Sequence, residues 1–239
     1  MSAHAPALSR RPHRAGPVLD LGGGAVLALS RLHEICGPAR RSLALVMAAR
    51  LAAAGREGPV WWIAPSWQAE QLHAEGVAAL FPPERLHFVR PKRAEDVLWT
   101  LEEVLRSGTS PLAVADIPGL PGLTAIRRLH LAAESGTALG PAVPLGLILT
   151  PGPGGAQGVE SRWRLSGDTP GGGAPLWRLD RLRSRMDPPR SWRLCLPPDS
   201  PRAPVLTPYP PPPPAGASTS PASDIRQKET SPGVASGLA

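Results

Sequence analysis

Leu32-His33-Glu34-Ile35-Cys36-Gly37-Pro38-Ala39-Arg40-Arg41-Ser42-Leu43 is the stretch on which the fold depends. It predicts a strand that runs into a glycine-started loop and then a helix, the place where nucleotide-binding proteins carry a phosphate-binding loop. A working loop has the pattern Gly-x-x-x-x-Gly-Lys-Ser/Thr, because the second glycine lets backbone amides wrap the phosphates and the lysine meets their charge. This stretch lacks both that glycine and that lysine, so the loop is incomplete.

Apolar runs and helical patterns alternate after this stretch. Short apolar runs bounded by turn residues predict buried strands at 59–64, 86–89, 112–115 and 145–149. Between them, apolar residues at helical spacing predict helices over 42–54, over 94–107, and from Thr124 as N-cap to a stop at Gly136. Strands and helices in alternation predict an α/β fold with a mainly parallel sheet flanked by helices.

The pattern changes after residue 160, where arginine alternates with tryptophan and leucine. Segments 161–166, 176–182 and 191–196 predict half-exposed antiparallel strands at the C-terminal side of the sheet. A period of two places the tryptophans on a buried face and the neighbouring arginines outward. The surface expected to contact DNA or an acidic partner comprises Arg162, Arg164, Arg178, Arg181 and Arg193. The same pattern is also typical of a merely solvated face.

Composition divides the chain into three parts. Residues 197–239 contain 12 prolines among 43 residues, which predicts a disordered Pro-rich tail. We expect a flexible N-terminal segment at 1–24 and one domain at 25–196. No run approaches the roughly 20 apolar residues of a membrane span, and the first residues lack the apolar core of a secretory signal. We therefore expect a cytoplasmic protein that does not contact a membrane.

Cysteine usage narrows the chemistry further. The two cysteines are too few for a disulfide scaffold, and neither lies in a Cys/His cluster with the spacing of a zinc site. The histidines are scattered without shared spacing. We therefore expect no metal and no histidine-based catalysis.

The order and spacing of these segments resemble the ImuA family, the degenerate RecA-like accessory proteins of bacterial SOS mutagenesis, over about residues 25–196. The stretches that carry the resemblance are Glu34–Pro38, Arg90–Glu103, Asp116–Leu120, Arg127–Glu134 and Glu160–Leu165. No single stretch identifies the family, and the resemblance lies in the order and spacing of the stretches. The resemblance implies a RecA-like domain.

Most of the functional residues of RecA have no match in this chain. The resemblance makes Asp116 the match of the Walker B carboxylate. The vestigial phosphate loop that it implies comprises Gly37, Pro38, Arg40, Arg41 and Ser42. The glutamate that polarises the attacking water in RecA has no counterpart in 64–66. We expect no catalytic residue, no cofactor and no enzyme activity. Two plainer interpretations stay open, namely that Asp116 caps the following turn and that the two arginines are solvated.

The resemblance also implies a function. It is that of a non-catalytic scaffold of damage-induced translesion DNA synthesis. The implied partners are the inactive Y-family-like protein ImuB and an error-prone replicative-type DNA polymerase, with RecA and DNA as further candidates. One alternative is a divergent RecA-type DNA-dependent ATPase that recruits Lys92, the only lysine of the expected domain. Another is a cell-division inhibitor that resembles SulA and binds FtsZ.

Overall fold

The computed structural model describes residues 16–168, 176–197 and 199–209. These residues form a nine-stranded sheet with the strand order β11-β10-β9-β8-β3-β7-β6-β4-β5, and a separate two-stranded ribbon β1-β2. Strands pair in parallel from β8 to β5 and antiparallel from β8 to β11. The strands are β1 (Val18–Gly22), β2 (Ala25–Ala28), β3 (Leu32–Cys36), β4 (Val60–Ile63), β5 (Leu86–Val89), β6 (Leu112–Asp116), β7 (Leu145–Leu149), β8 (Ser161–Gly167), β9 (Leu176–Ser184), β10 (Arg190–Cys195) and β11 (Val205–Pro208). The helices are α1 (Arg40–Ala53), α2 (Ala74–Leu80), the 3-10 turn η1 (Pro83–Arg85), α3 (Ala94–Ser107) and α4 (Leu123–Leu139).

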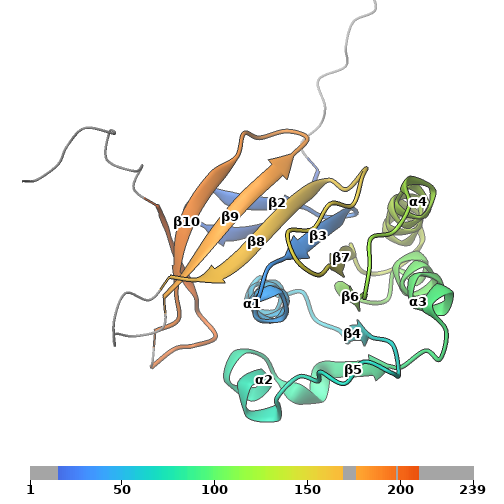
Figure 1. Ribbon diagram of the computed structural model, residues 1–239, viewed down its shortest axis with the longest axis horizontal. Helices are drawn as coiled ribbons and strands as arrows, with labels where there is room; N and C mark the ends of the chain where they lie inside the picture. Colours follow the sequence, from blue (N-terminus) through green and yellow to red (C-terminus); the bar gives the residue numbers. More distant parts are fainter. Residues whose placement is uncertain (1–15, 169–175, 198, 210–239) are drawn as a thin grey trace, which may run out of the picture. The chain divides into compact units, whose positions relative to one another are not determined.

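The parallel half of the sheet lies between two layers of helix. Figure 1 shows α1 on one side of β3, β7, β6 and β4, with α3 and α4 on the other side. Strands β3, β6 and β7 are buried at every residue, as parallel strands covered on both faces must be. The predicted α/β fold with a mainly parallel sheet flanked by helices is therefore confirmed. None of the described helices combines the length and the apolar composition that a bilayer crossing requires.

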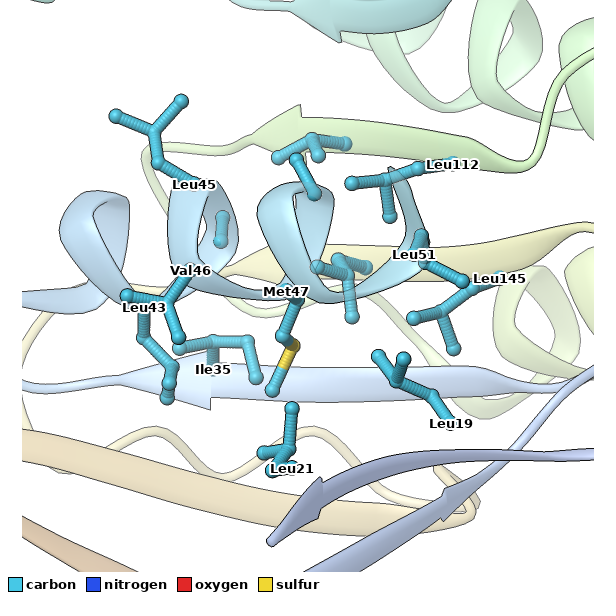
Figure 2. Packing of buried hydrophobic residues seen from close by; sticks show 14 of the residues in the cluster. Leu19, Leu21, Ile35, Leu43, Leu45, Val46, Met47, Leu51, Leu112 and Leu145 are labelled. Carbon is cyan, nitrogen blue, oxygen red and sulfur yellow. The ribbon is translucent and has the colours of Figure 1, made fainter. Parts of the chain in front are cut away.

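Helix α1 forms the centre of one core. Figure 2 shows Leu43, Val46 and Met47 pointing from α1 toward Ile35 of β3 and Leu21 of β1. All five side chains are buried. The strand, loop and helix predicted from residues 32–43 are thus fixed by apolar contacts on both sides of the loop, and these contacts set the position of the residues between them.

Helices α3 and α4 pack closely against each other, and glycine permits this. Gly136 lies inside α4, where a Cβ atom would overlap the backbone carbonyl oxygen of Leu105 in α3. The prediction that Gly136 ends the helix is wrong, because its hydrogen side chain serves the helix contact and α4 continues to Leu139. The predicted N-cap is also wrong, since Gly122 occupies that position and Thr124 lies within the helix.

The antiparallel half has one apolar face, formed by alternate residues of β8, β9 and β10. Trp163 and Trp192 are fully buried there, with ring centroids 5.6 Å apart. The β1-β2 ribbon covers this face, and the Trp192 indole donates a hydrogen bond of 2.9 Å to the carbonyl oxygen of Gly23. None of the described helices lies over the opposite face of β8–β10 in Figure 1.

Two terminal strands depart from the predicted domain bounds. The segment predicted to be flexible, 1–24, contains β1, whose alternate residues Leu19 and Leu21 are buried. Strand β11 likewise lies inside the segment predicted as a disordered tail, 197–239, and pairs with β10 through Leu206 and its neighbours. The sheet therefore recruits residues on both sides of 25–196, because Leu19, Leu21 and Leu206 complete the tryptophan core. The parts of both predictions at 1–15, 198 and 210–239 lie outside the described residues.

Candidate functional site

The predicted phosphate loop lies where the carboxyl ends of the parallel strands meet. Two hollows occur at this edge of the sheet, and Arg40, at the start of α1, lines both. The smaller has a volume of about 240 Å³ and reaches Gln68, Glu70 and Asp116. The larger, of about 450 Å³, is lined by Gly37, Pro38, Arg40, Gly152, Pro153 and Arg164. In open α/β sheets this edge is the usual place for a ligand.

The backbone amides of the loop are already engaged within the chain. Gly37 donates its N–H to the carbonyl of Gly152 at 3.1 Å, and Ala39 donates to that of Leu165 at 3.2 Å. Arg40 donates to the carbonyl of Gly37 at 3.3 Å, and Pro38 has no N–H to offer. A phosphate cradle needs free amides that converge on one point. From Gly37 to Arg40 the described loop has none.

Gly37 itself has a structural reason to be glycine. Its φ is +89°, and a Cβ atom would lie 2.8 Å from the carbonyl oxygen of Leu165 in β8. Both the left-handed backbone and the approach of β8 therefore exclude a side chain. The glycine that resembles the start of a phosphate loop is required here by packing.

Asp116 and the two arginines form a buried ionic cluster. The Nε atom of Arg41 donates to Asp116 Oδ2 at 2.5 Å, and Gln68 donates to the same oxygen at 3.0 Å. Arg40 Nε lies 3.6 Å from Asp116 Oδ1, and Arg41 also pairs with Glu70 at 2.6 Å. Burial disfavours the charged guanidinium, but the hydrogen bonds and negative charges of Asp116 and Glu70 outweigh it and raise the pKa of Arg41. The chain itself thus supplies the cations beside this carboxylate.

This cluster decides between the interpretations that the sequence leaves open. The Arg40 and Arg41 side chains are only 18% and 19% exposed, so they are not two solvated arginines. Asp116 is buried, and its hydrogen bonds come from Arg41 and Gln68, so ion pairing is its role. Ser42 is half-buried in the first turn of α1. The structure therefore brings together the predicted vestigial residues from Gly37 to Ser42 and Asp116 at one edge.

The arginine surface is only partly as predicted. Arg164, Arg178 and Arg193 lie on the face without a helix, with side chains between 42% and 44% exposed. Asp180 lies between them and accepts hydrogen bonds from Arg178 at 2.8 Å, Arg164 at 3.0 Å and Ser191 at 2.6 Å. Burial would raise the pKa of Asp180, but these three hydrogen bonds outweigh it and lower that pKa. The carboxylate thus stays ionised and holds Arg164 and Arg178 in place, while Arg193 lies 4.0 Å from Asp168.

Two of the five predicted surface arginines have other positions. Arg181 is 5% exposed and lies over the rings of Trp163 and Trp192, on the core face. The period of two already places Arg181 on the face of Leu179, so the strand pattern contained the signal. Arg162 is 18% exposed, because its Nε atom pairs with the buried carboxylate of Glu34 at 2.5 Å. These two assignments to an exposed surface are wrong, while binding at the other three stays a prediction.

Glu34 is a structural residue that the sequence reasoning missed. It is fully buried, and its carboxylate accepts hydrogen bonds from the Thr150 hydroxyl at 2.7 Å and the Gly155 N–H at 2.8 Å. The N–H of Ala156 and the Arg162 guanidinium complete its partners. The available signal was a single carboxylate within an apolar strand, because a buried charge needs an opposite charge. Glu34 therefore fixes the loop after β7 that lines the larger hollow.

One further pair of polar side chains lies inside the fold. The ring of His33 contacts the Ser161 hydroxyl at 2.6 Å and the carbonyl oxygen of Ala28 at 2.8 Å. Both side chains are buried, so this pair does not form an accessible catalytic dyad. Burial lowers the pKa of His33 to about 4, and the charges of His130 and Arg31 add to this effect. The histidine is therefore neutral in the folded protein near neutral pH.

The low pKa of His33 predicts acid sensitivity. The unfolded chain binds this proton below pH 6.5 and the folded chain only near pH 4, so stability is full above pH 6.5 and falls between these values. We expect the free energy of unfolding to drop by about 3 kcal/mol across that window. Urea unfolding at several pH values measures it. The change His73→Gln, at an exposed histidine, should leave the pH dependence of the free energy of unfolding as it is. An equally steep pH dependence in His33→Gln would show that His33 is not its source.

Detectable similarity to known proteins is confined to solved structures. No protein-family model and no curated protein matches the chain. Among solved structures, SulA from Pseudomonas aeruginosa is similar at 20% identity and a TM-score of 0.41, over 51% of this chain and 98% of that chain. The described fold and site define a mixed α/β protein in which two arginines of the chain pair with a buried aspartate at the carboxyl edge of the parallel strands.

Proposed function

We propose that this chain is a non-catalytic accessory protein of damage-induced translesion DNA synthesis, built on a RecA-like domain that has lost its nucleotide machinery. The resemblance of residues 25–196 to the ImuA family supports the pathway. The observation that carries the non-catalytic part is the ion pair between Asp116 and Arg41. It stands where a RecA-type enzyme would hold magnesium and phosphate.

The site lacks the parts that phosphoryl transfer requires. Catalysis of that reaction consists of positioning and charge stabilisation, from a loop lysine, free amides and a carboxylate that orients water. Here the amides of Gly37, Ala39 and Arg40 bond to carbonyl groups of the chain, and the segment after β4 reads Ala64-Pro65-Ser66. Arg41 is already paired with the buried carboxylate of Asp116, and a nucleotide that displaced it would have to break a buried ion pair, which costs about 3–5 kcal/mol.

A domain with this site is best suited to binding other macromolecules. The proposed partners are an ImuB-like protein and an error-prone replicative-type polymerase, with RecA and DNA as further candidates. RecA-type domains associate edge to edge, so a degenerate copy fits a docking role on such an assembly. The proposed location is the cytoplasm, where this machinery acts.

Nucleotide hydrolysis tests the non-catalytic part. We expect purified protein to release phosphate from ATP no faster than buffer, with or without single-stranded DNA. Turnover like that of RecA would contradict the proposal. Lys92→Ala is the informative control, because hydrolysis that this exposed lysine supports would favour the divergent ATPase.

A further inference from the structure

We propose that the larger hollow at the sheet edge, together with the arginine face of β8–β10, binds an extended acidic segment of a partner protein. The arginine track is defined here as Arg40, Arg164, Arg178 and Arg193. This inference rests on the proposed accessory function and names the chemistry by which a partner is held.

The hollow is positively charged and contains no carboxylate among its lining residues. Arg40 and Arg164 line it, with glycine and proline making up the rest of its wall. The Nε atoms of both arginines are buried and lack a hydrogen-bond acceptor, although Arg40 Nε is 3.6 Å from Asp116. Such guanidinium groups are incompletely satisfied by the chain. Because these Nε atoms are shielded from solvent, a carboxylate that enters the hollow would bond to the other nitrogens of the two guanidinium groups, whose side chains are 18% (Arg40) and 42% (Arg164) exposed.

The positive charge continues from the hollow across the open face. Arg164 and Arg178 bond to the same residue, Asp180, and Arg178 is the register partner of Arg193 in the next strand. The side chain of Asp180 is 6% exposed and that of Asp168, 4.0 Å from Arg193, is 26% exposed, whereas the three arginines are 42–44% exposed, so positive charge exceeds negative charge on this surface. Neighbouring strands are about 4.8 Å apart, and alternate residues of an extended segment are about 6.6 Å apart. Carboxylates on such a segment therefore reach successive arginines.

The chemistry of this face favours carboxylates over nucleic acid. Single-stranded nucleic acid is held by exposed aromatic rings on which bases stack. Trp163 and Trp192 are buried on the opposite face, and Arg178 and Arg193 already lie over the Tyr209 ring at 4.9 and 5.3 Å. Among the described residues of this face no other aromatic ring is offered. The planar guanidinium fork matches carboxylate and phosphate alike. The lack of free stacking rings is therefore what favours an acidic peptide over single-stranded nucleic acid.

Fluorescence anisotropy with the full chain tests the inference. The probe is a labelled peptide of about eight glutamates, long enough to span the three strands, and a glutamine peptide is its neutral counterpart. We expect saturable binding of the acidic peptide that Arg164→Gln weakens about tenfold. Arg178→Gln provides a second variant, and thermal unfolding confirms that both fold. The matched control is Arg127→Gln, an exposed arginine on α4, for which less than about a twofold change is expected.

Two results would overturn the inference. If Arg164→Gln and Arg127→Gln weakened peptide binding equally, only the net charge of the protein would attract the peptide. Tighter binding of a labelled oligothymidylate, with the same dependence on Arg164, would assign the face to nucleic acid. Neither result affects the proposed accessory function, which is measured separately by induced mutation in cells.

Discussion

Glu34→Gln is expected to lower the free energy of unfolding by about 3–5 kcal/mol, because it leaves the guanidinium of Arg162 without its counter-charge inside the fold. The carboxylate also accepts hydrogen bonds from Thr150, Gly155 and Ala156, and glutamine replaces one acceptor oxygen by a donor that faces these donors. Both effects act on the loop after β7. The same change should therefore loosen the wall of the larger hollow.

Denaturant unfolding measures this effect, and Glu102→Gln is the matched control. Glu102 is also a buried carboxylate with two arginine partners, but Arg106 and Arg128 are 45% and 60% exposed. Water can solvate those arginines, so we expect a loss below about 1 kcal/mol there. A double-mutant cycle of Glu34→Gln with Arg162→Gln should show strong coupling. If Glu34→Gln and Glu102→Gln lowered the free energy of unfolding equally, the buried ion pair of Glu34 with Arg162 would not be the cause of the loss.

Gly136→Ala is expected to destabilise the fold by about 3 kcal/mol or more, since the added Cβ atom would overlap the carbonyl oxygen of Leu105. The obstacle is backbone, so no side chain can rotate to make room. Helices α3 and α4 would have to separate, which would expose the core beneath Ile126 and Leu129. Thermal or denaturant unfolding measures the loss.

Gly76→Ala makes the same substitution where space is available. Gly76 lies exposed in α2, and a Cβ atom there meets nothing closer than 3.9 Å. Alanine should stabilise that helix by about 0.4–1 kcal/mol, because it restricts the unfolded chain. If Gly136→Ala and Gly76→Ala shifted the free energy of unfolding in the same direction, the close contact of α3 with α4 would not explain why residue 136 is glycine.

The sequence predicted those parts of the fold whose signal is local. Strands β6 and β7 appeared as continuous apolar runs because both of their faces are buried, and α3 ended at Gly108 as its pattern indicated. The prediction that 86–89 is buried is wrong, because β5 is the edge strand of the sheet and exposes His87 and Phe88. The ribbon β1-β2 escaped prediction, since its short runs are stabilised by contacts with Trp192, which is 169 positions from Gly23. Strand β11 escaped it because its four residues lie within the proline-rich composition of 197–239. Helix α2 buries only Val77 and Leu80, too few for a periodic pattern.

At the candidate site, too, the sequence predicted what strand order implies but not the contacts between residues far apart in the chain. Parallel strands bring their carboxyl ends together, so the meeting of Gly37 and Asp116 at one edge could be predicted. The pairing of Arg41 with Asp116 joins residues 75 positions apart, and no local pattern reports it. Likewise, Arg162 looked like an outward arginine until the register of β3 and β8 placed it opposite Glu34.

The central claim is that this chain serves induced mutagenesis without nucleotide chemistry. Its most direct test is the frequency of ultraviolet-induced mutation in the source cell after deletion of the gene, with complementation by the wild-type chain or by Asp116→Asn. Asparagine still accepts hydrogen bonds from Arg41 and Gln68, so it removes the carboxylate with less damage to the cluster than alanine would. Protein abundance is matched between the two. The account predicts that deletion reduces induced mutation to the uninduced background and that both chains restore it. Unchanged mutation after deletion, or restoration by the wild type alone, would contradict it.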